Sequence, residues 1–136
     1  MPEIPPRPAS LVLDERQEAV VQWRVGAALV AAAAGAGKTA VLTERTAALL
    51  ADGVLPESIL LLAYNKDAAE TLRKRIAARA GSLLGPRVQV YTFHAFGFAI
   101  LREWFPQEMR TVRVDDGRRC WQIARTWMPS INGSGS

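Results

Sequence analysis

A run of small residues ends in Gly37, Lys38 and Thr39, directly after an apolar stretch and directly before a helical pattern. The order of strand, tight loop and helix is the context that a phosphate-binding loop requires. Backbone N–H groups of small residues can close around a phosphate, and the following helix adds its own unpaired N–H groups. Lys38 would supply a cation for the β- and γ-phosphates, and Thr39 a hydroxyl for Mg²⁺. The stretch therefore predicts a nucleoside triphosphate site rather than a plain glycine-containing turn.

Gln17 stands three residues after Asp14, at the expected start of the first helix. This spacing is that of a capping box, in which two side chains satisfy each other's backbone N–H groups. A planar amide shortly before a phosphate loop can also pair with the edge of an adenine. Spacing alone supports both interpretations equally, and both stay open at this point.

Apolar periodicity predicts alternating strands and helices around these residues. A continuously apolar segment at 27–32 is typical of a central strand covered on both faces. The further expected elements are a helix at 38–51, a strand at 59–63, a helix at about 67–80, a strand at 88–91 and a helix to about Trp104. A single crossover helix between successive strands makes them parallel. The sequence therefore predicts an α/β fold with a parallel sheet flanked by helices.

Polar and aromatic side chains follow two of the expected strands, where open α/β sheets place their ligand groups. The two clusters are Tyr64, Asn65 and Lys66, and Thr92, Phe93 and His94. Rings stack on bases while hydroxyl, amide and ammonium groups hold phosphates, which suits a single nucleic-acid strand. Taken singly, Phe93 favours a place in the core, His94 favours a helix cap, and the basic residues at 73–79 favour a solvated helix face.

Four segments, in this order, resemble the motifs of UvrD/Rep-type superfamily 1 DNA helicases. Leu13–Gln17 is similar to the adenine-reading Q motif, and Ala32–Thr39 to motif I, which commonly begins with Ala in this family. Leu62–Ala69 is similar to motif Ia and Tyr91–Phe96 to motif Ib, both of which contact single-stranded DNA in the family. The segment around motif Ia resembles especially the helicase IV branch. The resemblance covers about residues 11–128.

The resemblance implies the N-terminal part of the first RecA-like motor domain of an ATP-dependent 3′-to-5′ DNA helicase. It implies ATP and Mg²⁺ as cofactors, single-stranded DNA as a partner, and catalytic roles for Lys38 and Thr39, with Thr39 reaching the metal through ATP. The ATP-binding residues that it implies are Leu13, Gln17, Ala34, Gly35, Ala36, Gly37, Lys38 and Thr39. The DNA-binding residues that it implies are Tyr64, Asn65, Lys66, Thr92, Phe93 and His94.

Two positions depart from the family pattern. Ala40 replaces an Arg that packs beside the nucleotide base in many members, and Ala33 stands where Gly is frequent. Both changes are compatible with phosphate binding. Without the Arg side chain, however, the predicted affinity for the nucleotide base has less support. Arg45, further along the same expected helix, could compensate.

The resemblance and the composition together predict a domain layout. Residues 1–10 form a proline-rich extended tail, 11–112 the N-terminal part of the ATP-binding motor domain, 113–130 the start of an inserted helical subdomain, and 131–136 a linker-like or artificial tail. Asp115 and Asp116 follow a strand-like stretch that Arg113 interrupts, so a helix N-cap is favoured over a Mg²⁺ ligand.

The composition indicates a folded protein without a membrane segment. Of 136 residues, 49% are hydrophobic and 22% charged, and no apolar run approaches the roughly 20 residues of a membrane span. The single Cys120 excludes an internal disulfide and fits a cytoplasmic location. The net charge of +4 permits a polyanionic partner without requiring one.

The family's Walker B acids, arginine fingers and second motor domain lie downstream of these motifs and are not recognised in this sequence. Phosphoryl transfer needs a metal-holding acid and an arginine for the developing charge, so we expect nucleotide binding without hydrolysis by this chain. Its further partner would be the remainder of the helicase chain. Two alternatives stay open, a non-catalytic P-loop nucleotide-binding module and a different P-loop enzyme such as a small-molecule kinase.

Overall fold

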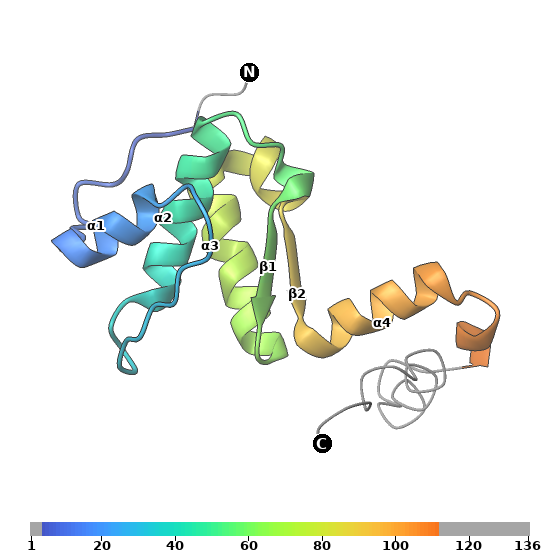
Figure 1. Ribbon diagram of the computed structural model, residues 1–136. Helices are drawn as coiled ribbons and strands as arrows, with labels where there is room; N and C mark the ends of the chain where they lie inside the picture. Colours follow the sequence, from blue (N-terminus) through green and yellow to red (C-terminus); the bar gives the residue numbers. More distant parts are fainter. Residues whose placement is uncertain (1–3, 112–136) are drawn as a thin grey trace. The chain divides into compact units, whose positions relative to one another are not determined.

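The computed structural model describes residues 4–111, which fall into two compact units that divide between Val90 and Tyr91 (Figure 1). The helices and strands are α1 (Glu15–Gln22), α2 (Lys38–Ala51), β1 (Leu60–Ala63), α3 (Lys66–Leu84), β2 (Gln89–Thr92) and α4 (Phe93–Trp104). Short 3₁₀ turns occur at Pro56–Ser58, Gly85–Arg87 and Glu108–Thr111. The expected inserted subdomain at 113–130, Asp115, Asp116, Cys120 and the tail at 131–136 lie outside the described residues.

β1 and β2 form a two-stranded parallel sheet, so the expected α/β class is confirmed at this coarse level. The backbone N–H of Gln89 donates to the carbonyl oxygen of Ile59 at 3.0 Å, which starts the pairing. The strands expected at 59–63 and 88–91 are confirmed to within a residue at each end. The guanidinium of Arg73 in α3 donates to the carbonyl of Val90, so this basic residue holds a strand rather than facing solvent alone.

The core of the first unit lies between α2, α3 and β1, and α3 packs against both of the other elements. Leu72, Ile76 and Ala80 recur at four-residue spacing on α3 and are all buried, as an amphipathic helix requires. The buried cluster consists of Leu50, Ile59, Ala63, Ala69, Leu72, Ile76, Ala80, Leu84, Val88 and Val90. The predicted helix at 38–51 is confirmed as α2, which is followed by Gly53 with φ 87°.

α3 runs on to Leu84, four residues beyond its expected end near Ala80. Gly81 has φ 82° and ψ 165° inside this span, so two helical segments meet at a kink there. The expected end therefore marks the kink, because glycine adopts a left-handed backbone that other residues avoid.

The prediction of a strand at 27–32 is wrong. No regular structure forms there, and Leu29 is 98% exposed instead of buried. The physical reason is that a strand gains its stability from hydrogen bonds to neighbouring strands, and within residues 4–111 β1 and β2 pair only with each other.

In the second unit, α4 begins at Phe93 with the Thr92 hydroxyl accepting a hydrogen bond from the Ala95 N–H at 3.2 Å. Thr92 is therefore the cap, and the interpretation of His94 as the cap is wrong. Phe93 is 59% exposed, so its expected place in the core is also wrong; the Phe96 ring packs near Tyr91 instead, with centroids 6.0 Å apart. Among residues 4–111, no helix is long and apolar enough to cross a membrane.

Candidate nucleotide-binding site

The loop before α2 turns through two glycines in the left-handed backbone region. Gly35 has φ 80° and Gly37 has φ 75°, and the Ala36 N–H donates to the Ala33 carbonyl at 3.3 Å. Gly37 is the N-cap residue of α2, and no side chain caps this helix. The first N–H groups of α2 are thus left without a capping side chain, which is the arrangement that attracts an anion.

Lys38 folds back over this loop. Its ammonium donates to the carbonyl oxygens of Ala32 at 2.9 Å and Ala33 at 2.6 Å, while the side chain remains exposed. Neutral carbonyls are weaker partners for an ammonium than phosphate oxygens are. The cation that the sequence singled out is therefore held at the loop by contacts that a phosphate could replace.

Gln17 connects α1 to the same loop. Its Oε1 accepts from the Asp14 N–H at 2.9 Å, and its own N–H donates to Asp14 Oδ1 at 2.8 Å, so the capping box is confirmed. Its Nε2 donates to the carbonyl of Ala36 at 3.1 Å. A Cβ on Gly37 would lie 3.2 Å from this Nε2, so the close approach also depends on glycine there. The second interpretation of Gln17, as an adenine reader, stays a prediction.

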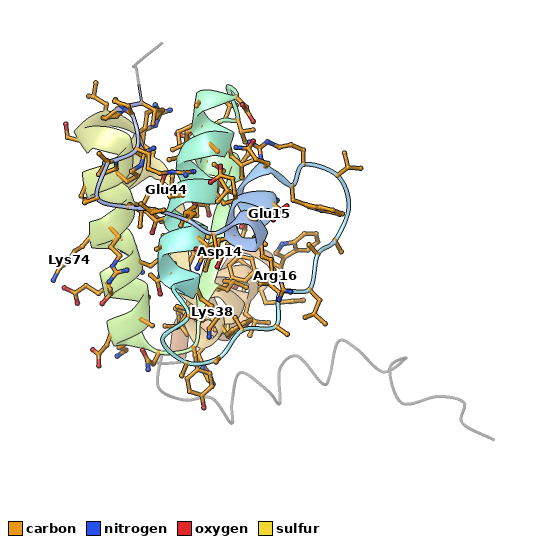
Figure 2. All side chains as sticks on the ribbon, turned by 90° about the vertical axis from the view of Figure 1, so that its left-hand side faces the viewer. Asp14, Glu15, Arg16, Lys38, Glu44 and Lys74 are labelled. Atoms are coloured by element: carbon orange, nitrogen blue, oxygen red, sulfur yellow. The ribbon has the colours of Figure 1, made fainter. Side chains whose placement is uncertain are left out.

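A cavity of about 530 Å³ lies between α1, the loop and the stretch before it. Figure 2 shows Asp14, the N-cap residue of α1, Arg16 of α1 and Lys38 of α2, all three of which line it. The lining residues are Asp14, Arg16, Gln17, Val20, Leu29, Val30, Ala31, Ala32, Ala36, Lys38, Val41 and Leu42. Of the expected ATP-binding residues, Gln17, Ala36 and Lys38 are in this set, whereas Leu13, Ala34, Gly35, Gly37 and Thr39 are not.

The sequence analysis missed the apolar wall of this cavity and one cation in it. Val20 lies three residues after Gln17 and Val41 three residues after Lys38, so helical spacing from the two expected ligands could have found both. Arg16 directly precedes Gln17 and carried no separate signal. The wall and the lysine together suit a ligand with an apolar ring and an anionic end.

Two further residues of α2 bear on the nucleotide. Thr39 lies in the first turn of α2, half-buried, and its carbonyl accepts from the Thr43 hydroxyl at 2.8 Å. Arg45 donates to the carbonyls of Val20, at 2.7 Å, and Trp23 at the end of α1. This guanidinium fixes α1 to α2, and Arg45 is not among the residues that line the cavity. Within residues 4–111 no group of three or more His, Cys, Asp or Glu side chains could hold a metal ion.

The residues expected to form motif Ia lie at the carboxyl end of β1, at the same end of the first unit as the start of α2 (Figure 1). Tyr64 is 87% exposed, Lys66 begins α3 with an exposed side chain, and Asn65 Oδ1 caps α3 by accepting from the Ala68 N–H at 2.8 Å. In the second unit, Thr92 caps α4, and Phe93 and His94 are exposed. Asn65 and Thr92 thus have structural roles that the sequence analysis did not assign to them.

Comparison with known proteins places this chain in a family. A family profile described as the UvrD/REP helicase N-terminal domain matches residues 13–125. The chain is 41% identical over 91 residues, 66% of its length, to the ATP-dependent DNA helicase PcrA of Leuconostoc citreum, covering 12% of that protein. It is 38% identical over 116 residues, 81% of its length, to the ATP-dependent DNA helicase UvrD2 of Mycobacterium tuberculosis (strain H37Rv), covering 15% of it.

A third relative is the probable DNA helicase II homolog of Mycoplasma pneumoniae, 35% identical over 95 residues that cover 69% of this chain and 13% of that protein. The chain therefore spans a small part of the length of each of these curated relatives. Because the matched profile extends over most of the sequence, from the capping box through the glycine loop before α2 and both strands, the chain belongs to the UvrD/REP helicase family, in its N-terminal domain.

Proposed function

We propose that this chain is the ATP-binding part of a RecA-like motor domain in a UvrD/Rep-like 3′-to-5′ DNA helicase. The observation that carries the proposal is the hydrogen bond from Gln17 Nε2 to the Ala36 carbonyl, at 3.1 Å. This hydrogen bond connects α1, which could contact a nucleobase, to the loop before α2, which could bind phosphates. Both Gln17 and Ala36 line the same cavity. A glycine turn with only a structural role would not need this contact with α1.

In this proposal, the Lys38 ammonium leaves the Ala32 and Ala33 carbonyls and pairs with the β- and γ-phosphates of ATP. The N–H groups of the loop and of the first turn of α2 surround the phosphates, because they point toward a negative charge at a helix N-terminus. The adenine lies against residues 29–32, which line the same cavity as Gln17 of α1, with the Gln17 amide at the edge of the base. Thr39 is the residue that would hold Mg²⁺, which neutralises charge on the triphosphate when bound.

The proposed DNA strand runs past the carboxyl end of β1. Tyr64 offers an exposed ring for stacking, and Lys66 offers a cation for the phosphates. Asn65, Thr92, Phe93 and His94 are the further proposed contacts, and exposed Phe93 and His94 are accessible to a ligand. Contacts of this kind are weak singly, so the chain by itself should bind single-stranded DNA weakly.

We further propose that the chain binds ATP without sustained hydrolysis. Asp14 is the acidic residue that lines the cavity, and its carboxylate is already engaged in capping α1. Phosphoryl transfer requires in addition a positioned water and an acid beside the metal. Those groups would come from other parts of a complete helicase.

The test is ATP binding by the wild-type chain, Lys38→Ala and Lys74→Ala, measured by isothermal titration calorimetry with Mg²⁺. Lys74 is a matched control because it lies on α3 in an exposed pair with Glu70, at 2.8 Å (Figure 2). We expect binding by the wild type and the Lys74 variant, and none by the Lys38 variant. Equal binding by all three would refute the site, and DNA-stimulated ATP turnover by the wild type would refute the claim about hydrolysis.

A further inference from the structure

The N-terminal segment of residues 4–10 is held on the helices by a group of four charged side chains. Arg7 donates through Nη1 and Nη2 to the two carboxylate oxygens of Glu18 in α1, at 2.7 and 3.1 Å. Arg7 also donates through Nε to Glu44 in α2, at 3.2 Å. Arg79 of α3 donates to Glu44 at 2.7 Å and to the Pro5 carbonyl. We call Arg7, Glu18, Glu44 and Arg79 the strap cluster.

Glu44 is the centre of the strap cluster. Its side chain is 2% exposed, and its two oxygens are bound by different arginines, Oε2 by Arg7 and Oε1 by Arg79. A buried carboxylate is tolerated only when paired and hydrogen-bonded, so this one ties Arg7 firmly to α2. Figure 2 shows the N-terminal segment crossing α2 at the level of Glu44 before it reaches Asp14.

Arg7, in the N-terminal segment, therefore connects α1 to α2 through Glu18 and Glu44. Its two Nη atoms hold Glu18 with fork geometry, which fixes orientation as well as distance. Glu18 is the residue directly after Gln17. Arg45 fixes the carboxyl end of α1 to α2 independently, so Arg7 governs the other part of the helix, nearest the capping box.

The cavity has walls from these two elements. α1 supplies Arg16, Gln17 and Val20, whereas the loop and α2 supply Ala36 and Lys38. The width of the side that would hold the apolar ring therefore depends on how α1 lies on α2. The phosphate side is formed by the loop and the start of α2, which α1 contacts through Gln17. A contact that fixes α1 should therefore act mainly on the half of the ligand that contains the ring, and less on the phosphates.

We propose that Arg7 is a positioning residue for the nucleoside half of the ligand, acting through Glu18 on the α1 wall of the cavity. This inference rests on the proposed nucleotide-binding function and adds to it the residue that sets base affinity. The N-terminal segment is thus part of the binding machinery, although none of residues 4–10 lines the cavity.

The experiment compares two ligands, Mg·ATP and magnesium tripolyphosphate, by calorimetry on the 136-residue chain. The variants are Arg7→Ala, Glu18→Gln and Arg87→Ala. Glu18→Gln leaves Arg7 on Glu44, so the buried charge stays paired if Arg7→Ala fails to fold. Arg87→Ala removes a comparable pair with Glu57, at 2.6 Å, whose residues do not line the cavity. Circular dichroism verifies that each variant is folded under the conditions of the titration.

We expect Kd for ATP to rise about two- to fivefold in Arg7→Ala and about twofold in Glu18→Gln, the range for partly exposed charged pairs. Kd for tripolyphosphate should rise less than Kd for ATP, and Arg87→Ala should change the Kd of neither ligand. A general loss of fold would weaken both ligands in parallel, so parallel losses would overturn the inference, as would an unchanged ATP affinity. A wild-type chain that bound neither ligand would overturn the proposed function and this inference with it.

Discussion

Removing the carboxylate of Glu44 tests the strap cluster as a source of stability. The side chain is 2% exposed and accepts charge-assisted hydrogen bonds from Arg7 at 3.2 Å and from Arg79 at 2.7 Å. A hydrogen bond to a charged group contributes about 1.5–3 kcal/mol, and losing one partner of a buried pair about 3–5 kcal/mol. The arginine side chains are 30% and 13% exposed, so the freed guanidinium groups can partly reach water. We therefore expect Glu44→Gln to lower the free energy of unfolding by about 2–3 kcal/mol.

Equilibrium unfolding in urea, followed by far-UV circular dichroism, measures this change. With a slope of about 2 kcal/mol per molar urea, the midpoint should fall by about 1–1.5 M at an unchanged slope. The matched control is Glu57→Gln, because Glu57 forms a solvent-exposed ion pair with Arg87 and its side chain is 49% exposed. We expect no resolvable shift for the control. If both variants unfolded at the same urea concentration, burial of the Glu44 pair would not be stabilising, and the reasoning would fail.

Three further expectations concern other parts of the site. Gly37→Ala should cost about 1–2 kcal/mol of unfolding free energy for its left-handed backbone, and it should also weaken ATP binding through the contact with Gln17, seen by calorimetry. Gly53→Ala, also at positive φ but with nothing within 4 Å, should destabilise without changing ATP affinity. The pKa of Glu18 is lowered, first by its hydrogen bond from Arg7, so the stability it contributes is present above the ordinary glutamate range. That contribution should disappear as the pH falls below about 4, and acid titrations of the unfolding midpoint should show a shallower fall in Glu18→Gln. Binding of a labelled DNA single strand, followed by anisotropy, should weaken steeply with salt because phosphate contacts release counterions; a flat salt dependence would contradict them.

Local rules predicted the elements around the site because each rests on neighbours in sequence. The spacing of Asp14 and Gln17 is sufficient for the capping box, and it forms as expected. Small residues before Lys38 and apolar periodicity after it are sufficient for α2, which has the expected bounds. The contact of Gln17 with Ala36 bridges 19 positions, and no local spacing encodes it. The sequence therefore predicts the individual helices and the loop of the site better than the contact that joins them.

The strap cluster could not be predicted for the same reason. Arg7 and Glu44 are 37 positions apart, and Arg79 and Pro5 are 74 apart. Arg79 belongs to a basic run that favoured a solvated face, yet its side chain is only 13% exposed because Glu44 draws it inward. The prolines correctly predicted that residues 4–10 form no helix. Composition contains no signal for where such an extended segment docks.

The prediction for residues 27–32 failed because an apolar segment can form either a buried strand or the wall of a binding cavity. An apolar run predicts removal from water, and a central strand is the commonest way to achieve it. Here no strand forms, and Leu29, Val30 and their neighbours instead line one side of the cavity. A nucleobase placed against that wall would remove apolar surface from water at about 25 cal/mol per Å², the same gain that strand packing would supply. The apolar run is thus consistent with a binding wall as well as with a core, and the neighbouring Lys38 is what favours the wall.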